Sequence, residues 1–455
     1  SVSPTSIRAD LEFLAADVMA GRDTPSPELE IAAQYLLSRV QRMGLQPGAD
    51  GAWFQPYELE RASLSEDSRL LLQCGGSRLE LTPLEGFLWI SCDREDADLV
   101  GSAVCIADAG KEALAAIAEG ALDGRWAVAT AVPKMLQTTR RRLSKAGAIG
   151  LLVIDDEQGT EDDRWYDRTR ARLTPGDFRL SRTPETDEDR SALPILRLTA
   201  ASSVRLRSAC PELRLELGAD LDLTVREQRV VQRESEAVRN ICALLPGTDP
   251  ERAEEVIVCS AHYDHVGVER GVVYPGADDN ASGTVGLLAL AEAFVARGPL
   301  ERSVLFVWLS GEEQGLWGSE AFCKSPPLAE GLHVAMDLNL DMIGRTAPGE
   351  LYVTPSRDHE EFNPLSELAY SLCASEGFPE LLSQDEFYRA SDHYNFATLL
   401  DVPVVFLSTG DHPDYHQPGD TPDKIDVDKL ARVVRLSARL VEGMATIELV
   451  EPVAR

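Results

Sequence analysis

The chain has 455 residues, 44% of them hydrophobic, so it can bury a sizeable core and is long enough for roughly two or three domains. Its 44 Lys and Arg stand against 76 Asp and Glu, and the formal net charge of -32 argues against nucleic acid or an anionic membrane surface as a partner. No uncharged apolar run reaches the roughly 18 residues that predict a membrane span.

The N-terminal residues, Ser-Val-Ser-Pro, are not a basic stretch followed by an apolar one, so a signal peptide is either absent or already removed. We expect the second case, a mature secreted or periplasmic chain. The eight cysteines are scattered, form no Cys-x-x-Cys pair and in several cases lie in apolar stretches. We expect buried thiols, with one or two disulfides as the alternative.

The first elements in chain order are helical. Apolar residues recur every three or four positions from Ile7 onward, and Gly44 is a good candidate for the residue that ends a second helix. A strand is expected at 53–59. Residues 61–216 then alternate short apolar runs with turns and charges, including a very polar loop at 155–190, which predicts a β-rich module with few helices and no ligand-like cluster.

From residue 217 onward the pattern is α/β. Strand candidates alternate with helices such as 281–297, which Gly298 is expected to cap. We therefore expect a mixed, mostly parallel twisted sheet flanked by helices. The strand candidates are 256–260, 304–310, 338–343 and 402–408.

Each of these strands runs into, or closely precedes, a His, Asp or Glu. His262 and Asp264 end the first strand, and Glu312 and Glu313 follow the second. Open α/β sheets bind their ligands at the carboxyl ends of strands, so these side chains are expected to share one crevice. Asp264 is placed to hold the second imidazole nitrogen of His262, as metal-bound histidines require.

The remaining clusters complete the pattern. Asp278 and Asp279 precede a helix, and two such acids facing a crevice would repel each other unless a cation neutralised them. Asp341 lies in an apolar run where an unpaired carboxylate would be costly, and His416 follows the last strand. Two histidines, three carboxylates and one further Glu suit a zinc pair, with cobalt or manganese as substitutes.

These motifs resemble the zinc aminopeptidase and glutamate carboxypeptidase family of clan MH. The resemblance covers about residues 240–425, in the order and approximate spacing of the family. The matching segments are His262-Tyr263-Asp264, Gly276-Ala277-Asp278-Asp279-Asn280-Ala281-Ser282-Gly283, Gly311-Glu312-Glu313, Asn339-Leu340-Asp341-Met342-Ile343-Gly344 and Tyr415-His416.

The resemblance implies two Zn²⁺ ions per chain and a role for each matching residue. Asp278 would bridge both ions and would be joined to Asp279 by a cis peptide bond. One ion would add His262 and Asp341, and the other would add Glu313 and His416. Glu312 would act as the general base on a water molecule, Asp264 would orient His262, and Tyr415 would help to hold the tetrahedral intermediate.

Several relatives carry a protease-associated domain before the metal core, and residues 61–216 resemble one more loosely. In this interpretation residues 1–60 are the first part of the catalytic domain, 61–216 are the insert and 217–455 complete the catalytic domain.

We expect a peptide-cleaving aminopeptidase. A carboxypeptidase or dipeptidase is the alternative and would need a basic pocket, for which Arg345 and Arg389 are candidates. Glutaminyl cyclisation and a non-enzymatic receptor are disfavoured because all six metal and base positions are filled. Ser391-Asp392-His393 suggests a serine triad, but adjacent residues rarely meet in triad geometry, so a supporting role is expected. His265 and His412 are expected to support the ligands or the fold rather than to bind metal. A role in shaping the substrate pocket is considered for Phe387, Tyr388 and Phe396.

Overall fold

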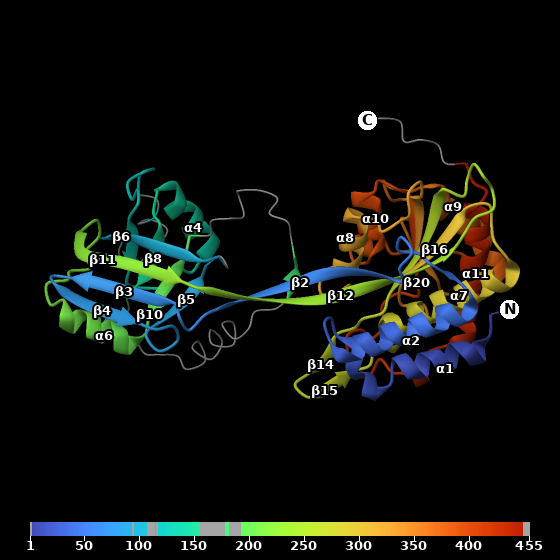
Figure 1. Cartoon of the computed structure of the whole chain (residues 1–455), viewed down its shortest axis with the longest axis horizontal. Helices are drawn as coiled ribbons and strands as arrows, with labels where there is room; N and C mark the ends of the chain where they lie inside the picture. The colour runs from blue at the N-terminus through green and yellow to red at the C-terminus, as the bar shows by residue number, and fades with distance from the viewer. Residues whose placement is uncertain are drawn as a thin grey trace. The chain divides into compact units, whose positions relative to one another are not determined.

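The chain forms two compact units, which a computed structural model describes over residues 2–92, 95–106, 114, 117–154, 178–181 and 193–448. The first unit comprises Ser1–Glu58 and Ala237–Arg455, and the second comprises Leu59–Glu236 (Figure 1). The chain passes between them within β2 (Phe54–Leu64) and β12 (Val231–Leu245). Apart from residues 178–181, the predicted polar loop at 155–190 lies outside the described residues.

The second boundary differs from the expected residue 216. The strand β11 (Asp220–Arg229) pairs along its length with β6 (Ala97–Cys105) and β3 (Arg69–Cys74), so residues 217–236 belong with the second unit. Sequence periodicity alone did not separate this strand from the α/β region that follows it.

Four parallel strands form the centre of the first unit's sheet, in the order β20-β17-β13-β16. Antiparallel strands flank them, since β12 pairs with β16 and β18 (Tyr352–Thr354) pairs with β20. This arrangement confirms the expected mixed sheet, but only its centre is parallel and the outer pairings are mainly antiparallel. The parallel strands are β13 (Glu255–His262), β16 (Ser303–Leu309), β17 (His333–Leu340) and β20 (Val404–Ser408).

Helices cover both faces of this sheet (Figure 1). Successive side chains of a strand point to opposite faces, so Ile257 and Cys259 of β13 pack in one apolar core, whereas Val256 and Val258 pack in another. The first core is completed by α1 (Pro4–Leu14), α2 (Pro27–Met43), α7 (Gly283–Arg297), α9 (Pro364–Leu372) and α11 (Val427–Met444), and the second by α8 (Trp317–Lys324) and α10 (His393–Leu399).

The second helix shows how local sequence sets these elements. Ser26 accepts a hydrogen bond from the backbone N–H of Leu29 at 3.0 Å, and Pro27 occupies the first helical turn. Gly44 ends the helix in the left-handed region at φ 84°, as the sequence predicts.

The connections of β13 and β17 locate the crevice. The chain leaves β13 through α7 to reach β16 on one side, and it then returns through α8 to β17 on the other side of β13. Strands whose connections diverge in this way leave a crevice at their carboxyl ends, where α/β proteins bind ligands. β17 ends at Leu340, three residues before the end of the predicted range 338–343, so Asp341 is the first residue beyond the strand and lies at this crevice.

The second unit contains an eight-stranded sheet in the order β4-β3-β11-β6-β7-β8-β10-β5. Trp126 and Val128 of β7 face one apolar core, and Ala127 and Ala129 face another. The elements not yet given are β4 (Ser77–Leu81), β5 (Phe87–Ser91), β7 (Trp126–Ala129), β8 (Gly150–Val153), β10 (Ile195–Leu198), α4 (Leu136–Lys145) and α6 (Ala200–Ala209). The β-rich character expected for this region is therefore observed.

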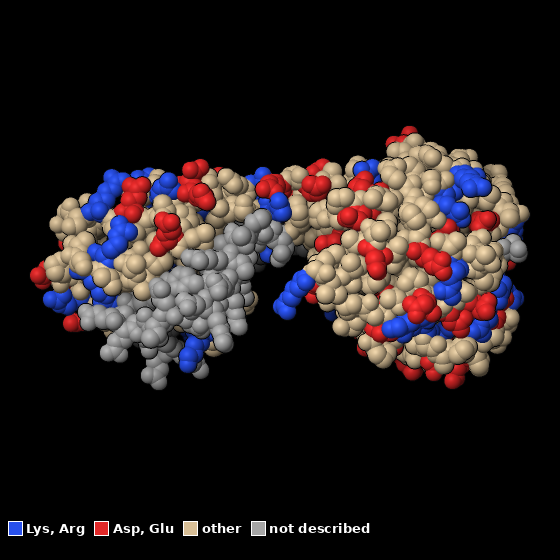
Figure 2. Space-filling model, turned by 90° about the horizontal axis from the view of Figure 1, so that it is seen from below, with Lys and Arg blue, Asp and Glu red and all other residues tan. Residues whose placement is uncertain are grey.

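Charged residues of both signs are interspersed on the face of each unit shown in Figure 2. Among the described residues, no helix combines the length and the apolar character needed to cross a membrane.

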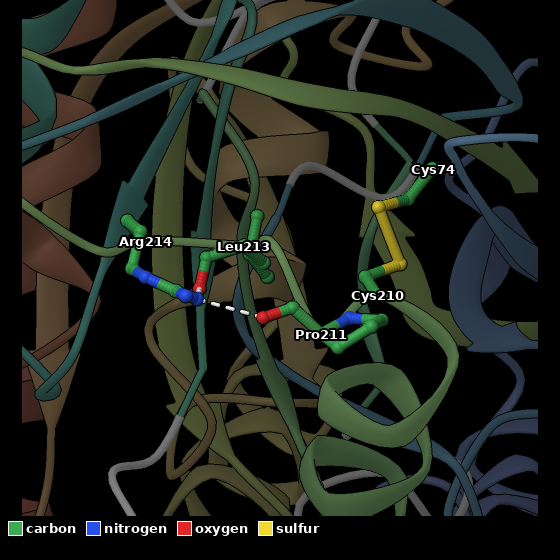
Figure 3. The surroundings of a disulfide bond; sticks show 5 residues. All are labelled: Cys74, Cys210, Pro211, Leu213 and Arg214. Atoms are coloured by element: carbon green, nitrogen blue, oxygen red, sulfur yellow. Dashed lines mark hydrogen bonds between the residues drawn. A yellow bond between two sulfur atoms is a disulfide. The ribbon is translucent and has the colours of Figure 1, made fainter.

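A disulfide joins Cys74, at the end of β3, to Cys210, directly after α6 (Figure 3). The Cα atoms of the two residues lie 6.0 Å apart, and 136 positions separate them in the sequence. Arg214 donates a hydrogen bond to the carbonyl of Pro211 at 2.7 Å and so holds the turn that follows. In the first unit, four cysteines are buried thiols outside any disulfide, namely Cys242, Cys259, Cys323 and Cys373. Both expected states of cysteine are therefore found, with buried thiols in the first unit and a disulfide in the second.

Replacing Cys74 by Ser should destabilise the second unit by about 2–4 kcal/mol, because the crosslink restricts a long loop in the unfolded chain. Denaturant unfolding followed by tryptophan fluorescence measures this change. The double variant Cys74→Ser/Cys210→Ser should cost little more than the single one, and reduced wild type should match it. Equal stability of oxidised wild type and Cys74→Ser would contradict the prediction.

Candidate metal centre

Six acidic and imidazole side chains converge at the crevice and form two groups that share Asp279. The ligand atoms within each group lie within 4.8 Å of one another. The first group contains His262, Asp279 and Asp341, and the second contains His265, Asp279, Glu313 and His416. The structure therefore brings together four of the five ligands that the resemblance implies, and it adds Asp279 and His265.

In the first group, no hydrogen bond joins His262 to Asp279 or to Asp341, and a cation would fit between these side chains. Nε2 of His262 lies 3.3 Å from Oδ1 of Asp341 and 3.5 Å from Oδ1 of Asp279. Nε2 of His262 and Oδ1 of Asp341 are both buried without a hydrogen-bond partner among the described residues. Such atoms are costly unless something pairs with them, and a divalent cation between the two would satisfy both.

The second group surrounds the other oxygen of Asp279. Nε2 of His416 lies 3.0 Å from Oδ2 of Asp279 and 3.0 Å from Oε2 of Glu313. Nδ1 of His265 lies 2.6 Å from Oε1 of Glu313, so the two oxygens of this carboxylate have different partners. Imidazole and carboxylate donors without thiolate suit zinc.

Asp279, and not Asp278 as expected, is the residue that the two groups of candidate ligands share. The two oxygens of Asp279 face different groups, whereas the carboxylate of Asp278 points away from them. Oδ1 of Asp278 accepts a hydrogen bond from the backbone N–H of Gly344 at 2.7 Å, and its Oδ2 lies 3.3 Å from Nε2 of His412. The cis peptide bond is likewise one residue later than expected, between Asp279 and Asn280.

Backbone contacts set the register of this loop. Oδ2 of Asp420 accepts hydrogen bonds from the backbone N–H groups of Asp278 and Asp279 at 2.9 and 3.1 Å. A Cβ on Gly344 would lie 2.9 Å from Oδ1 of Asp278, so only glycine permits this approach. Because these partners are remote in sequence, the motif alone could not show which of two adjacent acids faces the crevice.

Asp264 connects the predicted base to the first group. Its Oδ1 lies 3.6 Å from Nδ1 of His262 and accepts a hydrogen bond from the backbone N–H of Glu312 at 3.3 Å. Its Oδ2 accepts a hydrogen bond from the hydroxyl of Thr24 at 3.1 Å. Nδ1 of His262 lies 3.3 Å from the backbone carbonyl oxygen of Asp264, closer than it lies to the carboxylate, so the orienting role of that carboxylate stays a prediction.

Sequence reasoning missed Arg22, a fully buried residue of the 3₁₀ segment η1 (Asp17–Arg22). Its guanidinium donates to the carbonyls of Tyr263, Pro275 and Gly276 at 2.9, 2.9 and 3.0 Å, and these residues adjoin the metal-binding motifs. Burial lowers the pKa of Arg22 to about 10, although nearby carboxylates including Asp264 favour its charge. Its separation of more than 200 residues from the motifs left no local signal.

The negative charge of the two groups shifts the pKa values of the residues that compose them. Burial alone would lower the pKa of His416, but its hydrogen bonds to Asp279 and Glu313 raise that pKa to about 10. Burial raises the pKa of Asp279 to about 6, together with the charge of Glu313 and against the hydrogen bond from His416. A cation at this position would replace the proton of His416 as the partner of both acids.

Glu312 and Tyr415 line a cavity beside the two groups. The lining of this cavity also includes Asp279, Asp341 and Asp411. Burial raises the pKa of Glu312 well above its ordinary value, with Asp341 and Glu313 adding to the effect and His262 opposing it. The ring of Tyr415 stacks on that of His416 with centroids 3.9 Å apart.

None of the described residues that line this cavity is Lys or Arg. Arg345, a candidate for a basic pocket, instead donates a hydrogen bond to Asp414 at 2.8 Å, and Arg389 lies over the ring of Tyr394. Neither candidate therefore provides the carboxylate-binding group that a carboxypeptidase would need.

The other candidates have separate positions. Ser391 donates a hydrogen bond to Oδ2 of Asp341 at 2.8 Å and lines the cavity, as its supporting role predicts. The side chains of Asp392 and His393 make no hydrogen bond to each other, so the three do not form a triad. Phe387 lines the cavity, whereas Tyr388 and Phe396 belong to an apolar core.

Asp279→Asn should lower the binding of divalent metal by at least one ion per chain, because it removes the shared charge between the two groups. Asp278→Asn is the matched control and should retain metal, since an amide oxygen can still accept from Gly344. Metal content after equilibration with Zn²⁺ and gel filtration measures both. Loss of metal only in Asp278→Asn would restore the original assignment.

Comparisons with known proteins agree with this geometry. Residues 240–441 match the model of peptidase family M28. A probable leucine aminopeptidase of Arthroderma otae is 31% identical over 216 residues, which cover 45% of this chain and 56% of the relative. A probable leucine aminopeptidase of Trichophyton verrucosum is 30% identical over 217 residues, with the same coverage of 45% and 56%. The chain thus spans about half the length of the curated relatives it matches.

Solved structures extend the likeness in fold to both units. An aminopeptidase from Aneurinibacillus sp. strain AM-1 superposes with a TM-score of 0.53 at 20% identity, over 97% of this chain and 93% of that one. A zinc aminopeptidase from Bacillus subtilis gives a TM-score of 0.52 at 17% identity, over 98% and 96%. Residues 240–441 are thus similar in sequence to peptidase family M28, and the solved aminopeptidases share the fold of the chain.

Proposed function

We propose that the chain is a zinc aminopeptidase that holds two zinc ions. The observation that carries the proposal is the position of Asp279, whose two oxygens face two separate groups of buried ligands. The first ion would be held by His262, Asp279 and Asp341, and the second by Asp279, Glu313 and His416. The leucine aminopeptidases and the zinc aminopeptidase named above support this choice of metal and reaction.

Zinc, when bound, would polarise the scissile carbonyl and lower the pKa of a water molecule. Glu312 lines the cavity and is placed to accept the proton of that water and to return it to the leaving amine. The backbone carbonyl of Asp264 would hold the imidazole of His262, and its carboxylate accepts a hydrogen bond from the backbone N–H of Glu312. The hydroxyl of Tyr415 is available to donate a hydrogen bond to the developing oxyanion.

The charges of the cavity favour a free N-terminus over a C-terminus. Asp279, Glu312, Asp341 and Asp411 line it, and none of the described lining residues is cationic. Bound zinc would offset the charge of Asp279 and Asp341, so the preference comes from Asp411, which can attract an α-ammonium group, and from the lack of a cationic partner for an α-carboxylate among the described lining residues. This supports an aminopeptidase over a carboxypeptidase or dipeptidase, and the two complete ligand groups support it over a single-zinc cyclase or a receptor.

We also propose that the second unit is a protease-associated domain and that the chain is secreted or periplasmic. The β-rich sheet of the second unit lies in sequence between the two parts of the catalytic unit, as a protease-associated domain would. The disulfide between Cys74 and Cys210 supports a secreted or periplasmic location, because such bonds persist in oxidising compartments.

The zinc-loaded chain should cleave leucine p-nitroanilide and should be at least about a hundredfold slower on the N-acetylated substrate, since acetylation removes the charge that the acidic cavity favours. Release of p-nitroaniline gives kcat/KM for both substrates. A chain that cleaves dipeptides with a blocked N-terminus and a free C-terminus faster would instead be a carboxypeptidase.

Glu312→Gln should retain both metal ions and fold normally, yet lose roughly 10²–10⁴-fold in kcat, because the amide cannot accept a proton. Metal analysis, thermal unfolding and kcat on the same anilide separate these effects. Near-normal turnover in this variant would remove Glu312 from the role of base.

A further inference from the structure

The cavity has one wall that the proposed chemistry does not use. Met342, Phe387 and Phe406 give it an apolar lining next to the metal-binding acids. Gln384 lines the same cavity, and only 3% of this residue is exposed. Its carboxamide makes no hydrogen bond to any residue that the structure describes, and its atoms are not among the fully buried polar atoms, so its donor and acceptor remain accessible at the cavity that Gln384 lines.

The loop that carries Gln384 is held in place by its neighbour Asp385. This carboxylate accepts hydrogen bonds from the hydroxyls of Thr354, Ser356 and Ser383 at 2.8, 2.5 and 3.0 Å, and from the backbone N–H of Ser356 at 2.8 Å. The backbone N–H of Gln384 donates to the carbonyl of Val353 at 3.3 Å. Gln384 is therefore positioned by a rigid support, as a residue that determines specificity must be.

An occupant without polar atoms would bury the carboxamide unsatisfied, which disfavours a purely aliphatic side chain such as leucine. A side chain with an apolar stem and an amide tip would pack against the apolar wall and pair with both the donor and the acceptor of Gln384. A carboxylate tip would instead face the acids of the cavity. Among unmodified residues, glutamine has this combination of an apolar stem and a neutral amide tip.

We propose that Gln384 determines the specificity of this chain and selects substrates whose N-terminal side chain ends in a neutral amide, with glutamine preferred over the similarly long methionine. This inference rests on the proposed aminopeptidase function and adds a substrate class to it. The relatives named leucine aminopeptidases provide no such expectation.

The test compares kcat/KM for fluorogenic amides of glutamine and methionine, and of the near-isosteric pair asparagine and leucine. Zinc-loaded wild type should favour the amide member of each pair by roughly ten- to a hundredfold. Gln384→Met should reverse the ratio, mainly by lowering kcat/KM for glutamine. Gln41→Met, at an exposed position of α2, is the matched control and should keep the wild-type ratio.

Gln384→Glu provides a second readout if the Met variant unfolds. The variant is isosteric, and its new charge should move the preference from glutamine toward lysine. If wild type hydrolyses the amides but prefers methionine, and both variants keep the wild-type ratios, Gln384 does not determine specificity. That result would leave the proposed aminopeptidase function intact. A folded, zinc-loaded wild type that hydrolyses none of the amides would overturn the proposed function, and this inference with it.

Discussion

Mutual repulsion among buried carboxylates is the constraint on which the rest of this structure depends. Asp279, Glu313 and Asp341 converge from separate loops at the carboxyl ends of parallel strands, where desolvation strengthens their repulsion. Cations must offset this charge. Hydrogen bonds to Asp279 and Glu313 raise the pKa of His416, which favours its cationic form beside these acids, and the buried guanidinium of Arg22 adds a second positive charge. The two ligand groups around Asp279 show where divalent ions would provide the rest.

The fold makes this convergence possible because the residues that hold the loops in place are not the residues that supply the ligand atoms. The sheet places His262 and Asp341 at neighbouring strand ends, and the N-terminal segment reaches back to hold the loops that carry the other ligands. Asp278 and Asp420 then set the register of the loop before α7. A residue that touches no ligand atom can therefore matter for metal binding, because it determines which of two adjacent acids faces the crevice.

The same acidic character shapes the proposed selectivity. Asp411 can attract a free ammonium group, and the described lining residues offer no Lys or Arg to a terminal carboxylate, so the surroundings of the metal-binding groups favour one end of a peptide over the other. Specificity for the side chain must then come from the neutral part of the cavity. There Gln384 lies among the apolar residues of the lining, and the hydrogen bonds that Ser356 donates to Asp385 hold its loop in place.

The sequence by itself determined the α/β core, the helix ends at Gly44 and Gly298, and the chemistry of the ligands, because apolar periodicity and the polar residues that follow each strand are local properties. It did not determine that Asp279 rather than Asp278 faces the crevice, that β11 belongs to the second unit, or that Arg22 lies beneath the site. Only the tertiary structure decided these points, since each depends on hydrogen bonds or strand pairing between segments that are far apart in the chain.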